Sequence, residues 1–194
     1  SCFQQCSKDF FAGDDIGDRK RRFRKARWIN PDRGEMFFAK RVVFVEGETE
    51  SVAFPYLAEI LGRFNPDVSL IDCGSKHNLP LYIEIAKAFN IPYLVIHDED
   101  PLPDPIPDDW NQNKIREKSN TYALNQEIRD LVEAPLGRIE MLSPDFEKVA
   151  GVPRSQGERK GKALAALEHF ESVDKDNVPE RLKEIVYTAF DLDG

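Results

Sequence analysis

Short apolar runs, rich in β-branched residues, alternate along this chain with stretches of helical periodicity. The runs cover residues 42–45, 68–71 and 93–96, and helical patterns cover residues 49–64 and 78–90 between them. Apolar runs of this length are typical of strands that are buried on both faces of a sheet. Strands that alternate with helices at this spacing predict a parallel sheet with right-handed crossovers. The sequence therefore predicts an α/β fold, a Rossmann-like parallel sheet flanked by helices.

The rest of the chain divides around this core. Four prolines and three aspartates lie between Pro101 and Asp109, which predicts a loop directly after the third strand. A helix is expected over residues 114–133, a fourth strand over 138–142, and two more helices in the tail as a helical annex. We expect three parts: a basic helical arm or linker over residues 1–40, a core over residues 41–150 with a helical insertion around 111–134, and carboxy-terminal helices over residues 151–194.

The net charge of −8, from 27 basic and 35 acidic residues, is unevenly distributed. Seven of the nine residues from 19 to 27 are basic and none is acidic, so the rest of the chain carries 20 basic and 35 acidic residues. This block could follow a DNA backbone, or it could contact a preceding domain. An acidic total therefore does not exclude DNA as the partner. The basic residues concerned are Arg19, Lys20, Arg21, Arg22, Arg24, Lys25 and Arg27.

Several classes of protein are excluded or disfavoured by composition. No apolar run approaches the roughly eighteen residues of a membrane helix, so no membrane partner is expected. The three cysteines are odd in number and lack the C-x-x-C spacing of a structural zinc site, which favours a reducing, cytoplasmic setting. The chain begins at Ser1, and we expect it to be a fragment of a longer protein.

Acidic residues follow successive predicted strands: Glu46 after the first, Asp72 after the second, Asp98 and Asp100 after the third, and Asp145 and Glu147 after the fourth. In open α/β sheets the ligand site lies at the carboxyl ends of the strands, so these acids are expected to converge. Any single acid at such a place could simply cap the following helix. Their joint occurrence instead favours a site for a divalent ion with oxygen ligands, Mg²⁺ or Mn²⁺.

Two segments carry a family resemblance. RVVFVEGETE (Arg41 to Glu50) and VIHDED (Val95 to Asp100) resemble the Toprim fold, which has a glutamate after its first strand and D-x-D after its third. More narrowly, the segment from Asn30 to Pro55 resembles the carboxy-terminal nuclease region of the OLD (overcoming lysogenization defect) family. In that family an ABC-type ATPase precedes the Toprim nuclease. The resemblance covers approximately residues 30–162.

The resemblance implies a metal-dependent DNA endonuclease that uses two ions, Mg²⁺ or Mn²⁺. Glu46 and Glu50 would be metal ligands or acid/base groups, and Asp98 and Asp100 the D-x-D ligands. The acidic site after the fourth strand would fall on Ser143, Asp145 and Glu147. The family's late lysine best matches Lys162, with Lys160 as the competing assignment, although Ala163 stands where the family usually has a proline. From its position after Gly74, Lys76 could contact DNA phosphate or lie in a solvated loop.

Two other function classes stay open. A phosphatase of the haloacid dehalogenase type also has D-x-D after a buried strand, but its nucleophile normally follows the first strand. A Toprim module could also be noncatalytic and only bind partners. Because the chain has no G-x-x-x-x-G-K-[ST] motif, ATP is expected to bind only through a domain outside these residues, which could also mediate oligomerisation.

Overall fold

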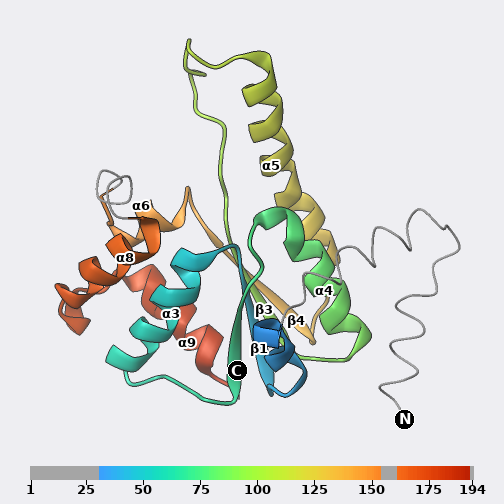
Figure 1. Ribbon diagram of the computed structural model, residues 1–194, viewed down its shortest axis with the longest axis vertical. Helices are drawn as coiled ribbons and strands as arrows, with labels where there is room; N and C mark the ends of the chain where they lie inside the picture. Colours follow the sequence, from blue (N-terminus) through green and yellow to red (C-terminus); the bar gives the residue numbers. More distant parts are fainter. Residues whose placement is uncertain (1–30, 154–160, 193–194) are drawn as a thin grey trace, which may run out of the picture.

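A four-stranded parallel sheet forms the centre of the molecule. The computed structural model describes residues 31–153 and 161–192. The sheet has the order β2-β1-β3-β4, and all neighbouring strands run parallel (Figure 1). The strands are β1 (Arg41–Val45), β2 (Val68–Asp72), β3 (Tyr93–Asp98) and β4 (Gly137–Leu142). The predicted α/β fold class is confirmed.

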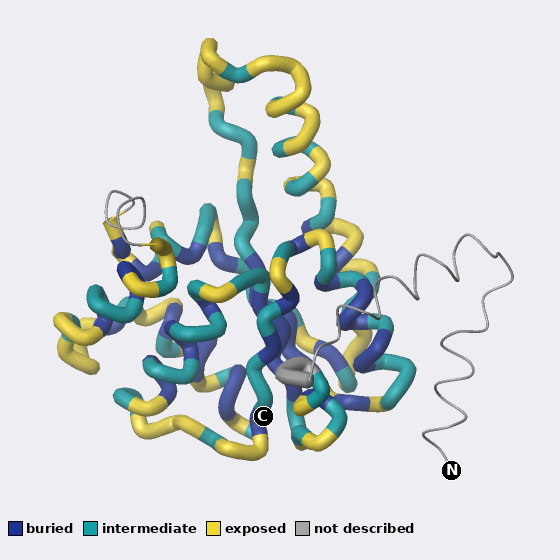
Figure 2. The backbone as a smooth tube through the Cα atoms, in the orientation of Figure 1, coloured by how far each residue is buried: buried dark blue, intermediate teal, exposed yellow. Residues whose placement is uncertain are grey.

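Two hydrophobic cores, one on each face, hold the sheet between helical layers. Because side chains alternate along a strand, Val43 and Val45 face one core while Val42 and Phe44 face the other. The first core is covered by α3 (Glu48–Ile60), α8 (Lys162–Glu171) and α9 (Glu180–Phe190). The second is covered by η1 (Pro31–Phe37), α4 (Leu79–Ala88) and the end of α5 (Gln112–Leu131). Figure 2 shows the buried strands in the middle of this sandwich.

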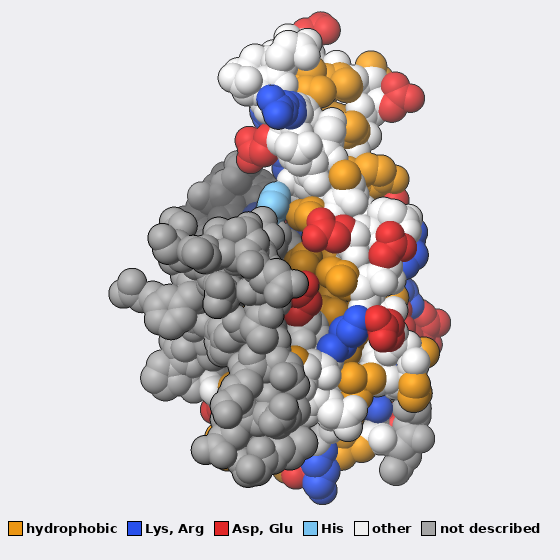
Figure 3. All heavy atoms as spheres, turned by 90° about the vertical axis from the view of Figure 1, so that its right-hand side faces the viewer, with side chains coloured by type: hydrophobic (Ala, Val, Ile, Leu, Met, Phe, Trp, Pro, Cys, Tyr) orange, Lys and Arg blue, Asp and Glu red, His pale blue; other side chains and the backbone are white. Residues whose placement is uncertain are grey.

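An arm projects from the carboxyl end of β3. The chain leaves the body through residues 99–111 and returns along α5, as Figure 1 shows. The side chain of Asn111 caps α5 by accepting a hydrogen bond from the N–H of Lys114, at 2.9 Å. Much of the arm is exposed, including Ile106 and Tyr122, and Figure 3 shows apolar side chains along it. Only the carboxy-terminal half of α5 reaches the body, where Asn125 and Ile128 are buried.

Differences from the expected elements lie mainly at their ends. α3 begins at Glu48, immediately after Gly47, and ends at Ile60, with Pro55 in its interior. The short elements η2 (Lys76–Asn78), α6 (Phe146–Ala150) and η3 (Lys175–Asn177) were not expected. α8 and α9 share a core with β1 and α3.

No helix in the described part of the chain is both long and apolar enough to span a membrane. The basic block of residues 19–27 and Lys160 lie outside the described residues.

Candidate metal centre

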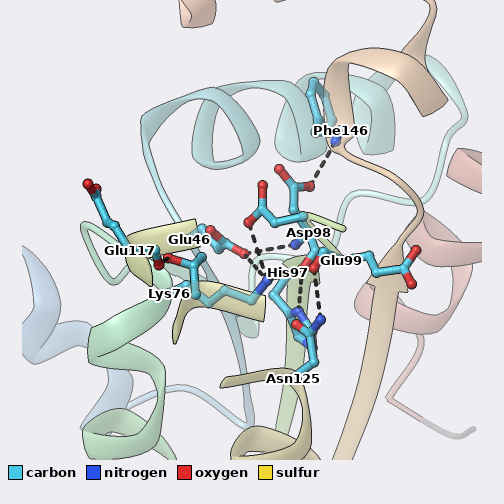
Figure 4. Close-up of polar contacts among 10 residues, drawn as sticks. Glu46, Lys76, His97, Asp98, Glu99, Glu117, Asn125 and Phe146 are labelled. Carbon is cyan, nitrogen blue, oxygen red and sulfur yellow. Dashed lines mark hydrogen bonds and ion pairs between the residues drawn. The ribbon is translucent and has the colours of Figure 1, made fainter. Parts of the chain in front are cut away.

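The acids of β1 and β3 meet at the carboxyl edge of the sheet. Glu46 directly follows β1, and its Oε1 accepts the backbone N–H of Asp98 at 2.8 Å. Asp98 is the last residue of β3, and its Oδ1 accepts the backbone N–H of Phe146 at 2.8 Å. Figure 4 shows the Asp98 carboxylate directed towards Phe146, the first residue of α6. The parallel register therefore brings the β1 glutamate and the first aspartate of D-x-D together.

The carboxylates of this cluster resist ionisation. Burial is the main cause that raises the pKa of Glu46 to about 7, with a smaller contribution from Asp100. Burial, together with the charges of Glu46 and Glu147, raises the pKa of Glu50 to about 7. For Asp98, burial and then Glu46, Glu50 and Asp100 raise the pKa to about 9. The cluster thus contains more negative charge than its cations neutralise, and protons or metal ions would stabilise it.

The D-x-D segment turns sharply after its first aspartate. Asp100 has a φ of 54°, in the left-handed region, and its N–H donates to the carbonyl of Pro144 at 2.9 Å. Its Oδ2 lies 3.3 Å from Nζ of Lys76. The extended chain of β3 ends at Asp98, so the two aspartates of D-x-D point to different places. Asp98 reaches α6, and Asp100 reaches η2.

Lys76 is buried beneath this turn, with 2% of its side chain exposed. Its Nζ donates to the carbonyl oxygens of Asp98 and Glu99 and forms ion pairs with Asp100 at 3.3 Å and Glu46 at 3.9 Å. The position expected for Lys76, with access to a DNA phosphate or in a solvated loop, is corrected by this burial. The sequence did carry one signal that Lys76 lies near the acids: it follows the end of a strand, β2, as the acids follow the ends of theirs.

Two further buried side chains support the same turn. His97, 1% exposed, has Nδ1 2.7 Å from the carbonyl oxygen of Asp98, and burial lowers the pKa of its imidazole to about 4. Asn125 of α5 donates from Nδ2 to the carbonyl of Glu99 at 2.8 Å. Sequence reasoning missed Asn125, because a lone asparagine in a helical pattern carries no sign of the loop that it contacts.

After β4, Glu147 joins the cluster, whereas two neighbouring residues have other partners. Glu147 forms an ion pair with Lys162, whose Nζ lies 2.6 Å from Oε1. Burial opposes the charge of Lys162, but Glu147, Asp98 and Glu50 outweigh it and raise the lysine's pKa. Asp145 caps α6 by accepting the N–H of Lys148 at 2.8 Å, and the Ser143 hydroxyl donates to Glu99. Glu147 and Lys162 are thus brought to the carboxylates, while Asp145 and Ser143 are held by local partners.

The donor chemistry of the cluster fits a hard divalent ion. Its side chains offer carboxylate oxygens, the ligands that Mg²⁺ and Mn²⁺ prefer, and their raised pKa values show that more positive charge would be favourable. Within residues 31–153 and 161–192, no three Asp, Glu, His or Cys side chains are already arranged around one point as ligands. Lys76, Lys162 and backbone N–H groups hold several of the carboxylates instead, so metal binding would exchange these partners.

The β2-β1-β3-β4 parallel sheet, with a glutamate after β1 and D-x-D from the end of β3, defines a Toprim domain. Residues 37–100 match the family model for the Toprim domain of overcoming lysogenization defect (OLD) protein-like proteins. This match, over about a third of the chain, confirms the resemblance to OLD-like Toprim domains seen in the sequence.

Two proteins illustrate the relationship. The chain is 29% identical over 172 residues to the OLD nuclease of Thermus scotoductus, across 86% of this chain and 31% of that protein. The chain thus spans about a third of the length of this relative. The C-terminal region of the Burkholderia pseudomallei OLD protein has a similar fold, with a TM-score of 0.50 and 17% identity across 79% of this chain and 100% of that one.

Proposed function

We propose that this chain is the nuclease portion of a longer ATPase–nuclease and that it cleaves phosphodiester bonds in DNA with two divalent ions. The observation that carries the proposal is the cluster of buried and half-buried carboxylates at the carboxyl edge of the sheet, three of which have raised pKa values. An arrangement of this kind is unfavourable without cations, so it favours a function that uses them. The similarity to an OLD nuclease supports the same reaction class.

The proposed roles follow from position. The residues that would hold two ions, Mg²⁺ or Mn²⁺, are Glu46, Glu50, Asp98, Asp100 and Glu147, with Ser143 and Asp145 as further ligands from the β4 loop. Bound ions would supply Lewis-acid activation of water and charge stabilisation at the leaving oxygen. Lys162 projects from the start of α8 with 68% of its side chain exposed, so its ammonium can contact a phosphate that enters beside Glu147.

The partners are proposed on the same basis. DNA is the substrate, cleaved without sequence preference, and residues 19–27 would follow its backbone. ATP would act only through a domain that lies outside this chain, and oligomerisation would use that domain. We infer a cytoplasmic setting, as expected for an enzyme that acts on DNA.

The test is nicking of supercoiled plasmid with Mg²⁺, Mn²⁺ or chelator. We expect nicking with a divalent ion, loss of nicking in Glu50→Gln, and normal nicking in the control Glu48→Gln, because Glu48 is exposed in the same helical turn. No nicking by the wild-type chain with any metal at high enzyme concentration would overturn the proposal and favour a noncatalytic module. Phosphate release from a small ester, without nicking, would favour the phosphatase.

A further inference from the structure

Buried polar side chains in the described part of the chain are concentrated at the D-x-D turn. They are Glu50, Lys76, His97 and Asn125. Three of these four contact two backbone carbonyls: Lys76 and His97 at Asp98, and Lys76 and Asn125 at Glu99. Figure 4 shows Lys76, His97 and Asn125 converging on this segment. Since buried polar groups are stabilised only by such partners, the turn is held from β3, η2 and α5 together.

Lys76 differs from the other two because it also contributes charge. It is the only lysine or arginine among the buried side chains of residues 34–153 and 161–192. Its Nζ lies 3.3 Å from Asp100 and 3.9 Å from Glu46. Both carboxylates are among the proposed ligands of the metal ions. An ammonium group buried at this depth is unfavourable unless anions and hydrogen-bond acceptors surround it, and here they do.

We propose that Lys76 is a positioning residue that serves as the internal cation of the metal-free centre. It holds the D-x-D turn through the two carbonyls, and it pairs with Asp100 and Glu46 until a divalent ion takes over these carboxylates. This inference deepens the proposed function and rests on it for the identity of the incoming ion. It also explains how so acidic a cluster stays folded before metal binds.

Two opposite effects follow from this role. Without metal, loss of the Lys76 charge leaves Glu46 and Asp100 without their nearest cation, so the fold should melt earlier. With metal, the same loss removes a positive charge that repels the incoming ion, so Mn²⁺ should bind more tightly. A lysine that served only to pack or to hydrogen-bond would lower the melting temperature equally with and without metal.

The test compares Lys76→Met with the control Lys87→Met. Lys87 is a partly buried lysine that, like Lys76, donates to a carbonyl, that of Leu131 at 3.3 Å, and pairs with a carboxylate, that of Glu133. It belongs to α4 and links this helix to the end of α5, away from the acidic cluster. In chelator we expect Lys76→Met to melt about 5–10 °C below wild type. Calorimetry should show Mn²⁺ binding about tenfold tighter in Lys76→Met than in wild type. In Lys87→Met, the Mn²⁺ affinity and the rise in melting temperature on adding Mn²⁺ should equal those of wild type.

The inference would be overturned if the melting temperature of Lys76→Met lay equally far below that of wild type with and without Mn²⁺. Unchanged or weaker Mn²⁺ binding in Lys76→Met would also overturn it. If Lys76→Met does not fold in chelator, millimolar Mn²⁺ or the second substitution Asp100→Asn must restore folding, and failure of both would also overturn it. If wild type itself binds no Mn²⁺, the proposed metal function fails separately. The double variant in chelator then still tests the pairing of Lys76 with Asp100, because Asp100→Asn should cost less stability in Lys76→Met than in wild type.

Discussion

Raising the pH in the absence of metal should destabilise this protein, and Asp98 should be the main cause. Burial and the neighbouring acids raise the pKa of its carboxyl from 3.8 to about 9 in the folded state. Between these two values the folded chain binds a proton that the unfolded chain has released. The stabilisation from this proton is therefore complete below pH 4 and is lost as the pH rises through 9.

The informative window is pH 7 to 9. Below pH 6.5 the lowered pKa of His97, about 4, acts in the opposite direction, because the unfolded imidazole binds a proton that the folded one does not. Glu46 and Glu50 have pKa values of about 7, so their contribution to the pH dependence of stability falls mostly near the lower end of the window. Integrated from pH 7 to 9, the Asp98 proton alone accounts for a loss of about 2 kcal/mol in the free energy of unfolding.

The assay is thermal melting in chelator at pH 7, 8 and 9. For a domain of this size, a loss of about 2 kcal/mol lowers the melting temperature by about 4–8 °C. In Asp98→Asn, which has no ionisable group at this position, most of the fall should disappear. Saturating Mn²⁺ should also flatten the profile of the wild type, because bound metal replaces the proton. A flat wild-type profile in chelator, or the same fall in Asp98→Asn, would refute the reasoning.

Two other substitutions test the fold and the site separately. Gly137→Ala would place a Cβ 2.3 Å from Cζ of the buried Tyr93 ring, so we expect a loss of about 1–3 kcal/mol in chemical denaturation; unchanged stability would show that the strand pair can separate there. Lys162→Ala should slow plasmid nicking about a hundredfold, while its melting temperature stays close to that of wild type because the side chain is largely exposed. Normal nicking in that variant would remove Lys162 from the site and reopen the assignment to Lys160.

The meeting of Glu46 and Asp98 could be predicted from the sequence because it depends on only two regularities. Their strands are short and buried, and the carboxyl ends of neighbouring parallel strands lie at the same edge of the sheet. Once residues 42–45 and 93–96 were recognised as strands, the acids that follow them had to converge. The same reasoning explains why the fold class could be predicted.

The surroundings of these acids could not be predicted in the same way. Lys76 and Asn125 reach the D-x-D turn from η2 and α5, so their contacts depend on tertiary packing across 22 to 26 residues of sequence. The turn itself depends on Asp100, whose left-handed backbone is uncommon for a residue other than glycine and is held by the carbonyl of Pro144. The local sequence pattern predicts neither the contacts of Lys76 and Asn125 nor the backbone conformation of Asp100.

The central claim is that the carboxylates at the strand ends form a divalent-metal centre. Its most direct test is the stoichiometry of Mn²⁺ binding, measured by electron paramagnetic resonance of the unbound ion during titration of the wild-type chain and of Asp98→Asn. We predict two ions per wild-type chain and the loss of at least one of them in Asp98→Asn. A wild-type chain that binds no Mn²⁺ at millimolar concentration, or an Asp98→Asn variant that still binds two ions with unchanged affinity, would contradict the account.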